Sequence, residues 1–128
     1  MQDDLKRWIV DLAKFMVARG CVSLPLPKVR FDDSVQDEDP RLFRTGNYSE
    51  SEDVITLFTN GRAIKDILRT FAHELIHVHQ RQTGRLGDVE TGSAIADDEG
   101  LRSLEGEAFM DGSLALRDWT ERVTHQKQ

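Results

Sequence analysis

The chain has 128 residues, of which 38% are hydrophobic and 31% charged, with nine glycines and three prolines. This composition indicates one compact globular domain and excludes a disordered or fibrous chain. The net charge of −6 argues against a nucleic-acid partner, because neutralising phosphates requires a basic surface. No apolar run approaches the roughly 20 residues that cross a bilayer, so we expect no membrane partner.

Cysteine usage and the N-terminus bear on the compartment. Cys21 is the only cysteine, which excludes an internal disulfide and suits a reducing environment. The first four residues lack the basic start of a secretory signal. We therefore expect a cytoplasmic protein.

The pattern of apolar residues predicts an α+β fold for a single domain over residues 1–128. Apolar residues at three- and four-residue steps indicate helices, whereas short alternating runs bounded by turn residues indicate strands. The predicted elements are, in chain order, a helix from Leu5 to Met16 that stops at Gly20, a strand at 28–31, paired strands at 42–48 and 54–59 across a turn at 49–53, a helix at 63–82, a loop at 88–100, a helix at 104–123 and a frayed tail at 124–128.

The strongest motif is HExxH, at residues 73–77 inside the predicted helix at 63–82. Residues four apart lie on one helical face, so His73 and His77 can reach one zinc ion, and Glu74 lies beside them as a general base. Thr70 falls on the same polar arc, while the opposite side of the helix is apolar. A buried helix with one polar arc predicts a metal site, because burying such groups without a partner costs several kcal/mol.

A catalytic zinc needs a third protein ligand, and the positions close to the motif do not offer one. The extended pattern HExxHxxGxxH is excluded, because Gln80 and Thr83 occupy its last two fixed positions. His79 lies on the apolar arc of the helix, where a hydrogen-bonded histidine near the core is expected. His125 lies in the predicted tail and is a weak candidate.

The last predicted helix offers a carboxylate instead. Glu107, Asp111 and Asp118 form one stripe beside an apolar face, and Glu105 projects about 160° away from Glu107. Both glutamates therefore cannot serve the same metal. We choose Glu107 as the third ligand and Asp111 as the acceptor that fixes the tautomer of a ligand histidine. The alternative for Glu107 is an ordinary carboxylate near a helix start.

Residues 71–80 together with 104–111 resemble the gluzincins, the HExxH zinc peptidases whose third ligand is a glutamate on a later helix. In that family the glutamate is followed by alanine and, four residues on, by aspartate, as Glu107, Ala108 and Asp111 are here. The resemblance implies zinc on His73, His77 and Glu107, with Asp111 orienting a histidine. It implies a minimal zincin domain, similar to ImmA/IrrE-like regulatory peptidases. Residues 60–77, with 117–119 later, also look like small metallopeptidases of tailed phages, which would imply host cytoplasm as the location if the chain is phage-encoded.

Residues 20–25 also resemble the cysteine motif of peptide deformylases, which carry HExxH and use cysteine as the third ligand. Against this, the glycine-rich motif expected upstream is missing, and Ile76 replaces the aspartate usual before the second histidine. The alternative for Cys21 is a small buried thiol after a helix stop.

The leading functional hypothesis is a small zinc metallopeptidase that cleaves peptide or protein substrates. Zinc would activate a water molecule, Glu74 would accept its proton, and Tyr48, the only tyrosine, could stabilise the oxyanion. By zincin resemblance, the strand at 54–58 would be the edge to which a substrate adds. The alternatives are a non-hydrolytic binding or regulatory protein that contains a metal, and a deformylase-like amidase.

Overall fold

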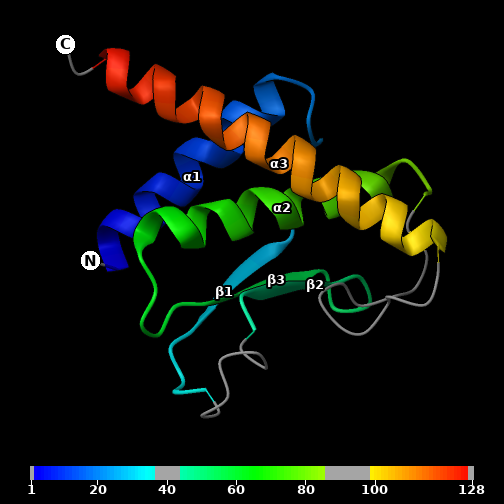
Figure 1. Cartoon of the computed structure of the whole chain (residues 1–128), viewed down its shortest axis with the longest axis horizontal. Helices are drawn as coiled ribbons and strands as arrows, with labels where there is room; N and C mark the ends of the chain where they lie inside the picture. Colours follow the sequence, from blue (N-terminus) through cyan, green and yellow to red (C-terminus); the bar gives the residue numbers. More distant parts are fainter. Residues whose placement is uncertain (1, 37–43, 86–98, 127–128) are drawn as a thin grey trace.

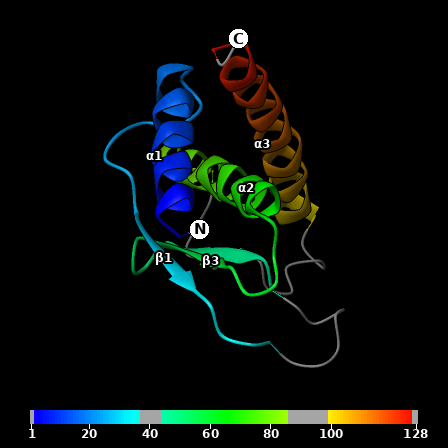
Figure 2. The same ribbon diagram turned by 90° about the vertical axis from the view of Figure 1, so that its left-hand side faces the viewer.

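The computed structural model describes residues 2–36, 44–85 and 99–126. Its elements are α1 (Gln2–Ala18), β1 (Lys28–Asp32), β2 (Gly46–Ser49), β3 (Val54–Phe58), α2 (Ile64–Gln82) and α3 (Glu99–Gln126). The predicted α+β class is confirmed. Helix α2 packs on β2 and β3 and contacts both other helices, so it lies between α1 and α3 with the sheet on its remaining side (Figures 1 and 2).

The sheet has the strand order β1-β3-β2. Strand β1 pairs with β3 in parallel, with Val29 opposite Ile55, and β2 pairs with β3 antiparallel, with Tyr48 opposite Ile55. Strand β3 is therefore central, and β1 and β2 are the edges. The expectation that residues 54–58 form a substrate-binding edge is wrong, because hydrogen-bonded neighbours occupy both sides of that strand.

Helix α1 forms as its periodicity predicts. Its apolar face is buried, with Leu5, Leu12 and Met16 at most 1% exposed. The helix ends where Gly20 adopts a φ of +79°, a left-handed conformation that glycine adopts without steric cost.

One arginine joins the sheet to the start of α2. The guanidinium of Arg62 donates to the carbonyl oxygens of Thr45 (2.9 Å), Phe58 (2.8 Å) and Asp66 (3.0 Å) and to the hydroxyl of Thr70 (2.8 Å). These acceptors lie just before β2, at the end of β3 and in the first two turns of α2. A single side chain therefore links two strands of the sheet to the start of α2.

Helix α3 is longer than predicted at both ends, and its close approach to α2 depends on Gly112. A Cβ atom at this position would lie 3.0 Å from both Cα and N of His73, closer than nearly all real contacts. Farther along α3, the indole of Trp119 donates to Asp11 of α1 at 2.8 Å. The predicted loop falls mostly at 88–98, outside the described residues, as do 42–43 of the predicted first paired strand and the last two residues of the predicted tail.

Within the described residues, no helix combines the length and the apolar character that a bilayer-spanning segment requires.

Candidate metal centre

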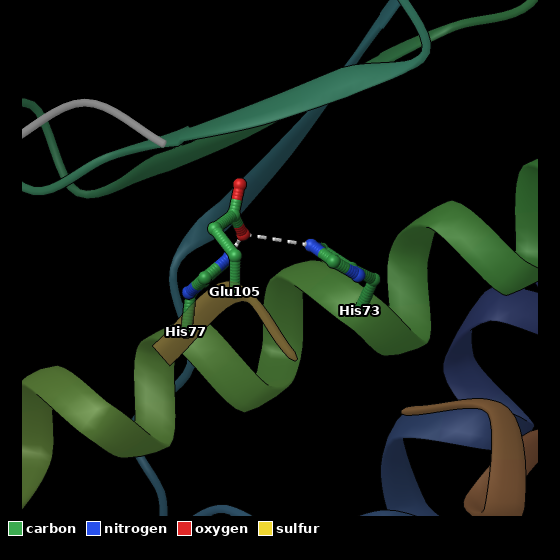
Figure 3. A group of neighbouring side chains, drawn as sticks. All are labelled: His73, His77 and Glu105. Atoms are coloured by element: carbon green, nitrogen blue, oxygen red, sulfur yellow. Dashed lines mark hydrogen bonds and ion pairs between the residues drawn. The ribbon is translucent and has the colours of Figure 1, made fainter. Parts of the chain in front are cut away.

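Two histidines of α2 and one glutamate of α3 converge on a common point. His73 and His77 lie one helical turn apart, with ring centroids separated by 4.9 Å. The Oε1 atom of Glu105 lies 3.1 Å from Nε2 of His73 and is hydrogen-bonded to Nε2 of His77. One ligand atom from each residue lies within 4.8 Å of the other two, and the three side chains point toward one another (Figure 3). This group could hold a metal ion.

The carboxylate that completes the group is Glu105, not Glu107, which corrects the sequence-based choice. Both oxygens of Glu107 accept hydrogen bonds from Arg85, at 2.7 and 2.8 Å. Hydrogen bonds from Arg85 and Gln80 lower the pKa of Glu107 to about 2. Residues two apart on a helix point in nearly opposite directions, so turning Glu105 toward α2 leaves Glu107 on the flank of α3.

Gln80, which is fully buried, holds the second histidine. Its amide nitrogen donates to the backbone carbonyl of Leu104 (2.8 Å) and to Glu107 (3.1 Å). Because these oxygens can only accept, the amide oxygen must face His77, where it accepts from Nδ1 at 2.8 Å. Nδ1 of His77 therefore carries a proton, and Nε2 faces Glu105, as a lone pair in the neutral imidazole and as a second N–H donor in the imidazolium.

The structure thus gives Gln80 the role that the sequence analysis assigned to Asp111. Asp111 is exposed on α3. Its charge contributes to raising the pKa values of Arg85 and Cys21. Gln80 can accept a hydrogen bond from His77 without any residue of α3, because residues three apart lie on one helical face.

The donor set fits a cation. Nε2 of His77 and the carboxylate of Glu105 are both acceptors, so a positive species must lie between them, either a proton or a metal ion. Hydrogen bonds from His73 and His77 lower the pKa of Glu105 to about 2. Burial lowers the pKa of His77, but the Glu105 hydrogen bond and the nearby Glu74 charge outweigh burial, and the net shift is upward. The site favours positive charge at its centre.

Glu74 lies beside this group without belonging to it. Its side chain is 3% exposed, and its charge raises the pKa of His77. The HExxH spacing therefore places a buried carboxylate next to the paired histidines, as predicted. Of the three members of the group, His77 is 1% exposed, whereas His73 and Glu105 are 25% and 29% exposed. The site opens to solvent on the His73–Glu105 side.

Tyr48 lies in the core instead of in a site open to substrate. Its side chain is 0% exposed, and its hydroxyl donates to Asp53 at 3.4 Å. Burial raises the pKa of Tyr48 to about 12. The structure therefore gives the predicted oxyanion donor a packing role at the turn between β2 and β3.

The remaining candidate ligands are not brought to the two histidines. Cys21 is half-buried after α1, where burial raises the pKa of its thiol, and within the described residues it is not part of the metal-ligating group. The deformylase-like ligand set is therefore not assembled. His79 is half-buried beside Glu107, whose pKa its charge lowers. The side chain of His125 lies outside the described part of the chain.

Sequence reasoning missed Glu105 and Gln80, although each carries a signal. Glu105 shares one helical arc with Ala108, Gly112 and Ala115, the small residues through which α3 approaches α2. Gln80 follows His77 by three residues. The carboxylate that points toward α2 is the one that shares a helical face with these small residues. The apolar residues beside the stripe of Glu107, Asp111 and Asp118 do not identify it.

No family model, no curated protein and no solved structure matches the chain.

Proposed function

We propose that this chain is a small zinc-dependent metallopeptidase of gluzincin type, which hydrolyses peptide bonds of a peptide or protein substrate in the cytoplasm. The observation that supports the proposal is the convergence of His73, His77 and Glu105 beside the buried Glu74. Two imidazoles, one carboxylate and an open side are the ligand set of catalytic zinc sites with a glutamate ligand.

His73, His77 and Glu105 would hold the ion, and zinc fits this combination of nitrogen and carboxylate ligands. When bound, it would polarise the scissile carbonyl and lower the pKa of a water molecule. Access from the His73–Glu105 side agrees with the exposure of these two side chains.

The chain's own residues have separate roles in this proposal. Glu74 accepts the proton of the attacking water and passes it to the leaving amine, as a general base and then a general acid. Gln80 keeps the proton of His77 on Nδ1, so that Nε2 remains a ligand. The Arg85–Glu107 pair positions the Gln80 amide through the bond between Gln80 and Glu107.

The test combines metal analysis with a peptide-library cleavage assay on the full chain. We expect about one zinc per chain, and we expect Glu74→Gln to retain zinc while losing cleavage by about 100-fold or more. Glu121→Gln, the same change at an exposed position of α3, is the control and should cleave normally.

Cleavage that survives Glu74→Gln, or a purified chain that takes up no zinc, would contradict the proposal. Zinc binding without cleavage of any library peptide would favour the other function considered, a non-hydrolytic binding or regulatory protein that contains a metal.

A further inference from the structure

A second surface lies away from the metal centre, between α1 and β1. It is an apolar groove of about 420 Å³, within the volume range of ligand and peptide pockets. Its floor is formed by Phe71 and Leu75 of α2, and its sides include Val10 and Leu24, which are 52% and 70% exposed. In Figure 2, α1 and β1 lie on the side of the molecule opposite α3. We call this surface the α1–β1 groove.

One wall of the groove is an edge strand. The amide of Lys28 donates to the carbonyl of Asp53 at 3.2 Å, and the carbonyl of Asp32 accepts from Thr59 at 3.0 Å. The backbone groups of residues 28, 30 and 32 therefore face β3, and those of Val29 and Phe31 face outward, because successive residues of a strand alternate. Among the described residues, neither Val29 nor Phe31 has a backbone partner on the outer side. A row of unpaired donors and acceptors can receive another strand.

Cations lie on both faces of the edge strand, one in the groove and two on the opposite face. Lys14 of α1 lines the groove. On β1, Val29 also lines the groove, so Lys28 and Arg30 project from the opposite face of the strand. None of these three cations forms an ion pair with a described residue. Asp32, on the same face as Arg30, accepts the backbone N–H of Ser34 at 3.0 Å. Hydrogen bonds from Ser34 lower the pKa of Asp32, and the charge of Arg30 also helps to lower it. Within the described residues, an acidic ligand would therefore find cations without an ion pair on both faces of the edge.

We propose that the α1–β1 groove binds an extended segment of another protein, in which apolar and acidic side chains alternate, by adding it as a strand to β1. Backbone hydrogen bonds to Val29 and Phe31 hold the segment, its apolar side chains enter the groove, and its acidic side chains meet Lys28 and Arg30. A second copy of this chain fits less well, since it would bring a second set of the same cations to the junction.

The inference does not depend on the metal chemistry, because no member of the His73–His77–Glu105 group lines the groove. Binding should be the same in Glu105→Ala and in the unsubstituted chain. The two proposals can therefore fail separately.

The test uses the full chain and a short fluorescein-labelled peptide in which valine and glutamate alternate, followed by fluorescence anisotropy. We expect saturable binding, weakened about 10-fold or more by the double change Lys28→Glu and Arg30→Glu. Lys65→Glu, the same change at an exposed lysine of α2, is the matched control. Leu24→Asp, at an exposed groove position, should also weaken binding without affecting the fold.

Amide hydrogen exchange read by NMR adds a position-specific measurement. The peptide should slow exchange at Val29 and Phe31 and leave that at Arg30, already directed toward β3, almost unchanged. Several results would overturn the proposal: no binding, equal binding of a peptide in which lysine replaces glutamate, unchanged exchange at Val29 and Phe31, or self-association in sedimentation with both amides protected before peptide is added.

Discussion

Helix α3 has two faces that differ in what their carboxylates do. The contact face carries Glu105 among small residues that approach α2, and this single carboxylate reaches both histidines. The carboxylate face carries Glu107, Asp111 and Asp118. Glu107 pairs with Arg85, and Asp118 pairs with Arg19 at 2.5 Å. The side chains of Glu105, Glu107 and Asp118 are similarly exposed, at 29%, 32% and 29%. What distinguishes Glu105 is therefore its direction toward the histidines of α2, whereas Glu107 and Asp118 face arginines.

The largest expected effect separates the two glutamates. Glu105→Ala should lower zinc affinity by about 100-fold or more, since it removes a ligand, whereas Glu107→Ala should lower it by less than about 10-fold, since it only loosens Gln80. Competition of each variant with a chromophoric chelator measures the affinity. Equal losses would mean that the two faces of α3 do not differ in this way.

Gln80 is hydrogen-bonded both to His77 and to Glu107, so it connects the metal-ligating group with the carboxylate face of α3. Replacing Gln80 tests this connection. Gln80→Leu should lower zinc affinity by about 10- to 100-fold, because His77 loses the acceptor that fixes its tautomer. NMR of the His77 ring nitrogens should show a mixture of tautomers. Gln82→Leu is the matched control, because Gln82 also ends α2 and makes two hydrogen bonds to Ser23. A similar loss of zinc affinity in Gln82→Leu would show that the effect of Gln80→Leu does not depend on the hydrogen bond to His77.

The glycines of α3 sharpen the comparison in terms of stability. Gly112→Ala forces a Cβ against the backbone of His73 and should lower the free energy of unfolding by about 1–3 kcal/mol. Gly106→Ala meets nothing within 4 Å and should raise it by about 0.5–1 kcal/mol, since alanine favours a helix. Urea denaturation measures both. Changes of the same sign would contradict the close approach at Gly112.

The smallest effect concerns pH on the carboxylate face. Arg19 holds the pKa of Asp118 below its ordinary value of 3.8. Because the folded-state pKa is depressed, Asp118 stabilises the fold above pH 3.8, and this contribution is lost as pH falls through the lower folded value. The urea midpoint of Asp118→Asn should therefore lie slightly below that of the unsubstituted chain at pH 7 and approach it at acidic pH. A gap that widens on acidification would be inconsistent with this pairing.

Local patterns predicted the helices, the strands and the HExxH histidines, because these depend on periodicity and spacing within one element. The choice between Glu105 and Glu107 depends on the rotation of α3 about its own axis, which Gly112 sets through contact with His73. The position of β3 depends on strand order, which no single strand encodes. Zinc binding, peptide hydrolysis and cytoplasmic location remain predictions.

The Arg62 guanidinium affects which parts of the molecule unfold together. One planar group bridges Thr45, Phe58 and Thr70. The ends of two strands and the first turns of α2 should therefore unfold together. A lysine there could not reproduce the forked set of donors. Without these hydrogen bonds, α2 could rotate relative to the sheet. Side chains farther along α2, which Arg62 does not contact, would then be displaced as well.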